Sequence, residues 1–158
     1  YGPLNEILSW LHLPQQEWLG STDTSMLSII ILNAWQTLGY YTIIILAGLT
    51  EIPKDLYESA SIDGASWFKK IVYVTIPLLK RSIIFIMIIM TINTLQVFDP
   101  VYILTQGGPV NSTNIVSYHM YEAAFNFGHA GLASAMAFIL FVMVLTLTTI
   151  QLRLFKSL

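Results

Sequence analysis

The sequence contains no cysteine and few charged side chains, since only 10% of its 158 residues are Asp, Glu, Lys or Arg. Without cysteine the chain cannot form a disulfide framework, a thiolate metal site or a cysteine nucleophile. Soluble domains carry about 25% charged residues, so this scarcity indicates a chain that is solvated largely by lipid. The sequence also lacks an initial Met and the pattern of a cleavable leader, and we expect it to begin inside a longer protein.

Three apolar segments are long enough to cross a bilayer, whose hydrocarbon core needs about 20 apolar residues in a helix. We predict spans at residues 26–50, 82–98 and 131–152. A buried helix of a soluble protein can imitate one such segment, but three of them leave too little polar chain to surround them. The sequence therefore predicts an all-α fold of polytopic membrane helices.

The seven Lys and Arg residues lie in only two parts of the sequence, residues 51–81 and 153–156. Loops on the cytoplasmic side of a membrane retain cations. We therefore expect the loop 51–81 and the tail 153–158 to face the cytoplasm, and residues 1–25 and 99–130 to face the other side.

Both segments predicted outside the cytoplasm show signs of local order. Leu4, Ile7, Leu8 and Leu11 have helical spacing, and Trp10 suits the headgroup level of a membrane. In 99–130 we expect a turn at the Gly-Gly-Pro sequence and then a helix along the membrane interface. The residues expected to cap that helix are Ser112, Thr113 or Asn114.

The predicted cytoplasmic loop has the pattern of two short helices around a tight turn. Pro53 suits the first turn of a helix, and Gly64, after Asp63, can take the left-handed backbone that ends one. Residues 65–74 can form the second helix, which Pro77 should end or kink. Apolar side chains also crowd this loop, which is either an ordinary surface loop or a docking surface for a partner.

Residues 58–77 resemble the Glu-Ala-Ala loop of ABC importer permeases. That motif has Glu-Ala-Ala, three residues, Gly, nine residues and then Ile-x-Leu-Pro; here Glu58-Ser59-Ala60, Gly64 and Pro77 keep the spacing. Ser59, Val74 and Ile76 are mild departures. The segments AGLTEIPKDLYE, FDPVYILTQGGP and FGHAGLASAMAF resemble the carbohydrate permeases of this group, so the likeness runs from end to end.

This resemblance implies that the chain is the last three spans of a six-span type I importer core. It also implies that the loop is a coupling helix seated in a cytoplasmic ATPase dimer, whose closure on ATP rocks the spans. The implied partners are that ATPase, a second permease subunit, an extracytoplasmic solute-binding protein and a sugar, in a bacterial plasma membrane. The implied ATPase-docking residues are Glu58, Ser59, Ala60, Asp63, Gly64 and Pro77.

Uncharged polar residues inside the first two spans are candidates for the substrate pathway. Such groups in lipid usually face the bundle interior, where they either bond neighbouring helices or touch the transported molecule. Because the family's substrate contacts fall in these spans, the resemblance favours Gln36, Tyr40, Asn93, Thr94 and Gln96. Aromatic, amide and hydroxyl groups suit a sugar, and the absence of a cation from the predicted spans favours a neutral one.

Other functions remain as alternatives. A channel or secondary transporter fragment fits the hydropathy but not the loop spacing, and a non-transporting assembly subunit does not need polar groups in its spans. The sequence contains no P-loop, catalytic triad or metal-ligand cluster. We therefore expect no enzymatic activity, no cofactor and no nucleic-acid partner, and we expect the scattered His12, His119 and His129 to be structural.

Overall fold

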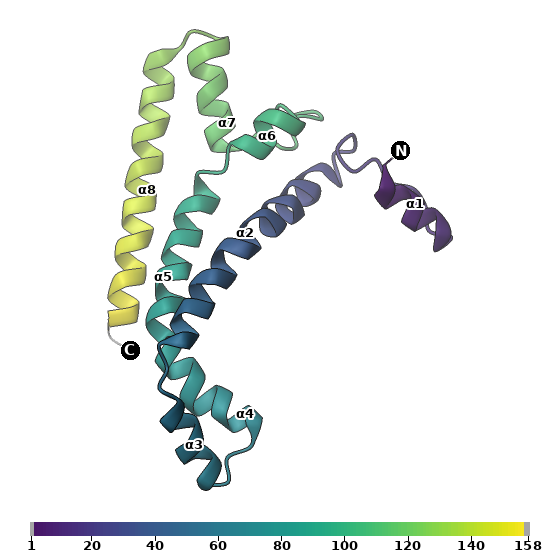
Figure 1. Ribbon diagram of the computed structural model, residues 1–158. Helices are drawn as coiled ribbons and strands as arrows, with labels where there is room; N and C mark the ends of the chain where they lie inside the picture. Colours follow the sequence, from purple (N-terminus) through teal and green to yellow (C-terminus); the bar gives the residue numbers. More distant parts are fainter. Residues whose placement is uncertain (1, 157–158) are drawn as a thin grey trace. The chain divides into compact units, whose positions relative to one another are not determined.

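A computed structural model describes residues 2–156, and the residues it describes form helices and connecting turns without a strand (Figure 1). Their order along the chain is α1 (Pro3–Trp10), α2 (Ser25–Thr50), α3 (Lys54–Ile62), α4 (Trp67–Lys70), the π-helix η1 (Ile71–Thr75), α5 (Ile76–Leu95), α6 (Asp99–Leu104), α7 (Val116–Tyr121), the π-helix η2 (Glu122–Asn126) and α8 (Ala130–Lys156). The all-α prediction is confirmed.

Three stretches of the described chain are long and apolar enough to cross a membrane: Ser25–Thr50, Trp67–Leu104 and Ala130–Phe155. They contain the three predicted spans. Their large apolar side chains are mostly exposed, as expected of helices that are surrounded by lipid rather than by a protein core.

Of the two outcomes predicted at Pro77, an end or a kink of the helix, the structure excludes the end, because helical backbone passes through this residue. Pro77 is the second residue of α5, and helical backbone continues through η1 into α4. In a regular α-helix the proline ring would clash with the carbonyl four residues earlier, that of Tyr73. Tyr73 lies in η1, whose wider turn changes that spacing.

The chain divides into two compact units. Unit 1 comprises Tyr1–Ala34 and Gln96–Ile139, and unit 2 comprises Trp35–Leu95 and Leu140–Leu158. Unit 2 contains the predicted docking loop; there, α3 and α4 lie side by side next to the start of α5 (Figure 1). The helices α2 and α5 approach closely at Gly48, where an added Cβ would lie 2.5 Å from Ser82 Oγ and 2.8 Å from Leu79 Cδ2.

Unit 1 has a core of its own. Ile29, Val101 and Tyr118 are buried together, with Phe98 and Tyr121 packed around them. Polar side chains tie the segments of this unit to one another: Ser25 Oγ lies 2.8 Å from Ser112 Oγ, and Asn5 bonds the backbone of Gln16 and the indole N–H of Trp18.

The expected cap of the helix after the Gly-Gly-Pro turn is also wrong. The residue that precedes α7 is Ile115, and no side chain caps the helix. Thr113 is instead fully buried. Its hydroxyl is satisfied there, since it donates to the carbonyl of Gly108 over 2.7 Å and lies 2.7 Å from Thr105 Oγ1. The polar residues of this stretch therefore fasten the turn to itself.

Candidate functional site

The turn after α3 is the feature on which the docking prediction depends, and its backbone is as the sequence predicts. Gly64 has φ +76°, and its N–H donates to the carbonyl of Ser61 over 3.1 Å. The next N–H, of Ala65, donates to the carbonyl of Ala60 over 2.9 Å. These two bonds are the Schellman arrangement, which satisfies the last carbonyls of a helix and needs a left-handed residue.

The surface around this turn is open and largely apolar. Ile62, Trp67 and Phe68 are 87%, 76% and 68% exposed. An added Cβ at Gly64 would meet no atom within 4 Å. Glu58 and Asp63 are exposed beside these apolar side chains. Large apolar side chains in a polar rim are typical of a surface that binds a partner.

The remaining predicted docking residues have structural roles that can be read directly. Ser59 Oγ donates to the carbonyl of Asp55 within α3, over 2.8 Å. Ala60 is half-buried, and its carbonyl accepts the bond that closes the turn. Pro77 lies in the first turn of α5, beyond η1. The structure therefore brings Ala60, Asp63 and Gly64 together at the turn, whereas Glu58 lies within α3 and Pro77 lies in α5.

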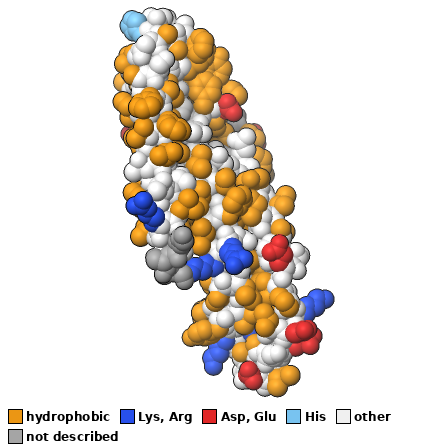
Figure 2. Space-filling model, turned by 90° about the vertical axis from the view of Figure 1, so that its left-hand side faces the viewer, with side chains coloured by type: hydrophobic (Ala, Val, Ile, Leu, Met, Phe, Trp, Pro, Cys, Tyr) orange, Lys and Arg blue, Asp and Glu red, His pale blue; other side chains and the backbone are white. Residues whose placement is uncertain are grey.

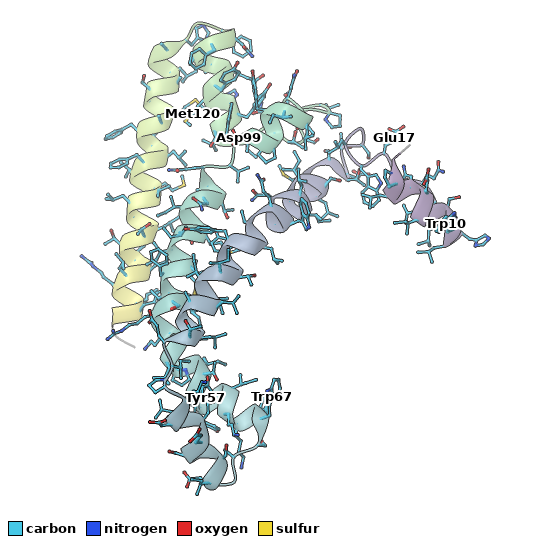
Figure 3. The ribbon with its side chains drawn as sticks, in the orientation of Figure 1. Trp10, Glu17, Tyr57, Trp67, Asp99 and Met120 are labelled. Carbon is cyan, nitrogen blue, oxygen red and sulfur yellow. The ribbon has the colours of Figure 1, made fainter. Side chains whose placement is uncertain are left out.

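Two hydrogen bonds fasten α3 to the helical stretch that leads into α5. Tyr57 OH lies 3.0 Å from Thr75 Oγ1, and Lys70 Nζ donates to Ser61 Oγ over 2.6 Å. Figure 3 shows Tyr57 on the side of α3 toward that stretch, whereas Trp67 points away from α3. Since Thr75 is the last residue of η1, the bond from Tyr57 connects α3 to the residue directly before α5.

The candidate pathway residues are not all brought together. Asn93 Nδ2 donates to the hydroxyl of Tyr41 over 3.5 Å, a long bond that joins α5 to α2. Gln36 and Tyr40 are exposed on α2, four residues apart and therefore on one face. Thr94 is exposed on α5.

Gln96 follows the end of α5 and belongs to unit 1, whereas the other four candidates belong to unit 2. Asn93 is thus the candidate for which the structure gives a polar partner on a second helix.

One polar pair in unit 2 was missed by the sequence reasoning. Gln151 Nε2 of α8 donates to Thr91 Oγ1 of α5 over 2.8 Å. Gln151 Oε1 and the nearby Thr148 Oγ1 are buried without a partner among the described residues. Gln151 near the end of an apolar span was the available signal, because an amide in lipid needs a bonding partner.

An aromatic cluster occupies unit 1, where the sequence predicted an interfacial helix. The rings of Phe98, Tyr102 and Tyr121 lie 5.0 to 5.4 Å apart, centroid to centroid. Burial raises the pKa of the Tyr118 phenol, and the Glu122 carboxylate and Tyr102 add to this. The bond to Tyr102 is the main cause of the raised pKa of Tyr121.

The His, Asp and Glu side chains of residues 2–156 do not gather into a metal-binding group. Among these residues no group of three or more His, Asp or Glu is placed to hold a metal ion. His119 Nδ1 lies 3.7 Å from Glu122 Oε2, an ion pair only when the histidine is protonated.

Comparison with known proteins identifies the family. The profile of the binding-protein-dependent transport system inner membrane component matches residues 5–158. The chain belongs to this family, and its three apolar helices make it a multi-pass protein of the bacterial inner membrane.

Similar proteins include sugar permeases. The trehalose/maltose transport system permease protein MalF of Thermococcus litoralis is 42% identical over 153 residues, which are 97% of this chain and 52% of that relative. The sulfoquinovosyl glycerol transport system permease protein SmoG of Agrobacterium fabrum is 34% identical over 157 residues, 99% of this chain and 51% of that relative. The chain thus spans about half the length of these relatives.

Two solved structures have the same fold. A bacterial ABC transporter involved in the import of the acidic polysaccharide alginate matches with a TM-score of 0.89 and 24% identity, over 99% of this chain and 55% of that one. The alginate transporter in complex with its alginate pentasaccharide-bound periplasmic protein matches with a TM-score of 0.86 and 25% identity, over 95% of this chain and 52% of that one. The predicted fold, helices of an ABC importer permease, is confirmed.

Proposed function

We propose that the chain is part of the transmembrane permease subunit of an ABC importer that passes a sugar, driven by ATP hydrolysis in a partner ATPase docked on residues 51–77. The observation that carries this proposal is the exposed Schellman turn at Gly64, bordered by apolar side chains. Such a turn costs nothing for glycine and leaves a gap that a partner can enter. The family membership and the sugar-permease relatives support the same assignment.

Movement of the docked turn would reach the spans through the contacts of α3. Displacing α3 pulls on Thr75 through Tyr57 and on Lys70 through Ser61. Thr75 and Lys70 both belong to the helical stretch that continues into α5 without a break. The chain itself would hydrolyse nothing, and its further partners would be a second permease subunit and an extracytoplasmic solute-binding protein.

The docking assignment is tested by Gly64→Asp in the full-length permease. A side chain at φ +76° strains the backbone by about 1–2 kcal/mol. The new carboxylate would also have to lose its water on docking. We expect normal membrane insertion but loss of the ATPase in pull-down, or loss of uptake with the ATPase still bound.

Gly128→Asp is the matched control. Gly128 has φ +68° and nothing within 4 Å of an added Cβ, so the substitution brings a comparable strain and the same charge outside residues 51–77. It should retain the ATPase. Normal uptake by Gly64→Asp would refute the docking assignment.

The pathway role of Asn93 is tested by deleting its hydrogen bond with Tyr41 through a substitution of either residue. Tyr41→Phe and Asn93→Ala both delete the 3.5 Å bond between α2 and α5, but only the second removes the amide. If Asn93 touches the sugar, Asn93→Ala should reduce uptake much more than Tyr41→Phe while the complex remains assembled. Equal losses would mean that the residue only joins the helices.

A further inference from the structure

A groove of about 220 Å³ lies in unit 2 between the first turns of α5 and the end of α8. Its walls are Ile76, Pro77, Lys80, Ile83, Ile84 and Phe155. The five residues from α5 have spacings of three and four around Lys80, so they form one face of that helix. Lys80 is the single charged residue of this otherwise apolar lining, and it is half-buried.

Lys80 lies between two apolar parts of the groove, with Ile76 and Pro77 one turn before it and Ile83 and Ile84 one turn after it. Lys80 lies near the start of α5, with Arg81 next to it. Ile84 lies one helical turn, about 5.4 Å, further into the span. A cation at the membrane boundary followed by apolar walls matches a phosphate headgroup followed by an acyl chain.

The two helices that line the groove carry cations but no carboxylate. The sequences of α5 and α8 contain no Asp or Glu, and Arg153 adds a further exposed cation on α8. Within residues 2–156 the structure shows no ion pair for Lys80, Arg81 or Arg153. Figure 2 shows Lys and Arg side chains (blue) spread among hydrophobic side chains (orange) over the lower part of this face, with Asp or Glu side chains (red) near some of them.

We propose that this groove binds an anionic phospholipid, whose phosphate contacts Lys80 and Arg81 and whose acyl chain lies against Ile83, Ile84 and Phe155. Basic pockets between membrane helices bind anionic headgroups, and each Lys or Arg near the membrane surface contributes about a fivefold gain in affinity. A peptide segment would cover the apolar walls, but it would neutralise the cations only if it also carried Asp or Glu at the right place, whereas every anionic phospholipid joins the two features. The proposal depends on the groove and its charges, and not on the docking loop.

Occupancy is tested first by a photoreactive diazirine residue at position 84 of the full-length permease, assembled with its partners in vesicles that contain dioleoylphosphatidylglycerol. Mass spectrometry after illumination should find phosphatidylglycerol attached at this position. A cross-link to another segment of the permease, or to a partner subunit, would overturn the proposal.

Selectivity is tested by native mass spectrometry of the purified complex with dioleoylphosphatidylglycerol or dioleoylphosphatidylcholine. The unaltered complex should prefer phosphatidylglycerol at least about fivefold, and Lys80→Gln should lower that preference about fivefold. Lys69→Gln removes an exposed cation that does not line the groove, so it should leave the preference unchanged.

Ile84→Trp gives a measurement that does not depend on removing a charge. The indole ring is larger than the isoleucine side chain, so it should fill the groove and lower the binding of both lipids in an assembled complex. Equal binding of the two lipids by the unaltered complex, or an unchanged preference in Lys80→Gln, would each refute the site.

Discussion

Two glycines of this chain have nearly the same left-handed backbone but very different surroundings. Gly64 has φ +76° and Gly107 has φ +81°. An added Cβ at Gly64 would meet nothing within 4 Å, whereas at Gly107 it would lie 2.9 Å from Cε1 of Tyr118. Glycine is therefore needed at Gly64 for its backbone alone, and at Gly107 also for the space it leaves.

The difference extends to the segments that contain the two turns. The turn at Gly107 is closed from inside unit 1, because Thr113 bonds Gly108 and the Tyr118 ring covers Gly107. Its loop also holds Gln106, Val110 and Asn111 at positive φ, a strain that the surrounding contacts must offset. The turn at Gly64 has no such cover. One turn is completed by its own chain, and the other presents a surface that a partner would complete.

The largest difference in hydrogen exchange should be the one between Gly107→Ala and Gly64→Ala, each measured around its own turn. Both substitutions add about 1–2 kcal/mol of backbone strain. Only the first forces a Cβ against a buried ring, which adds about 1–3 kcal/mol of overpacking. Hydrogen exchange in the full-length permease should show faster opening of residues 105–118 in Gly107→Ala than of residues 60–66 in Gly64→Ala.

Gly131→Ala is the control for this pair. Gly131 lies in α8 with nothing within 4 Å of an added Cβ, so hydrogen exchange should change in neither residues 60–66 nor residues 105–118. Equal opening in the two test variants would mean that the Tyr118 ring moves aside freely and that the two turns do not differ.

Thr113→Val should also loosen the loop that contains Gly107, but less than Gly107→Ala does. The substitution preserves shape but leaves the half-buried Gly108 carbonyl without its donor and Thr105 without its neighbour, at a cost of about 1–3 kcal/mol. Thr146→Val is the matched control, since that hydroxyl is exposed and bonds only a carbonyl of its own helix. Exchange over 105–118 measures the effect, and protection as high as in the control would contradict the role of Thr113.

Tyr57→Phe should have a smaller effect, confined to the docking loop. It removes the bond to Thr75, worth about 0.5–1.5 kcal/mol, and leaves the ring in place. Exchange should rise in residues 71–75, and uptake should fall per ATP hydrolysed because displacement of α3 reaches α5 less directly. Tyr73→Phe, whose ring is exposed, is the control. Unchanged coupling in Tyr57→Phe would show that this bond transmits nothing.

Alkaline pH should produce the smallest effect, again at the closed turn. The pKa of Tyr118 is raised from 10.0, chiefly by burial, so the folded state favours the neutral phenol. Its contribution to stability is complete below pH 10 and is lost as the pH rises through the higher pKa of the folded state. Exchange over 105–118, corrected for its intrinsic pH dependence, should therefore increase above pH 10. Tyr118→Phe should reduce that increase, and an increase as large as in the unaltered protein would assign it to another group such as Tyr121, whose pKa is also raised.

Local chemistry made part of this structure predictable. The three apolar segments could be recognised because a span needs a long run without charge, and Gly64 because a glycine after Asp63 at a helix end is the usual left-handed stop. Both signals lie in a few neighbouring residues and need no information about the rest of the fold.

The errors arose where distant residues decide the outcome. Thr113 resembles a helix cap in sequence, but its hydroxyl bonds Thr105 and the carbonyl of Gly108 within the turn. The bond between Thr91 and Gln151 joins residues 60 positions apart, and no periodicity predicts such a pairing. The roles of Gln36, Tyr40, Asn93, Thr94 and Gln96 in a pathway remain a prediction.

The wide turn of η1 has a geometric consequence for the docking loop. A π-helical turn advances the chain through a smaller angle per residue than an α-helical turn does. If Ile71–Thr75 were regular α-helix, every residue before them would be turned by roughly a quarter of a revolution about the axis of α5. A substitution that returned Ile71–Thr75 to regular α-helix should therefore turn α3 and the Gly64 turn about the axis of α5 without changing any side chain of that turn.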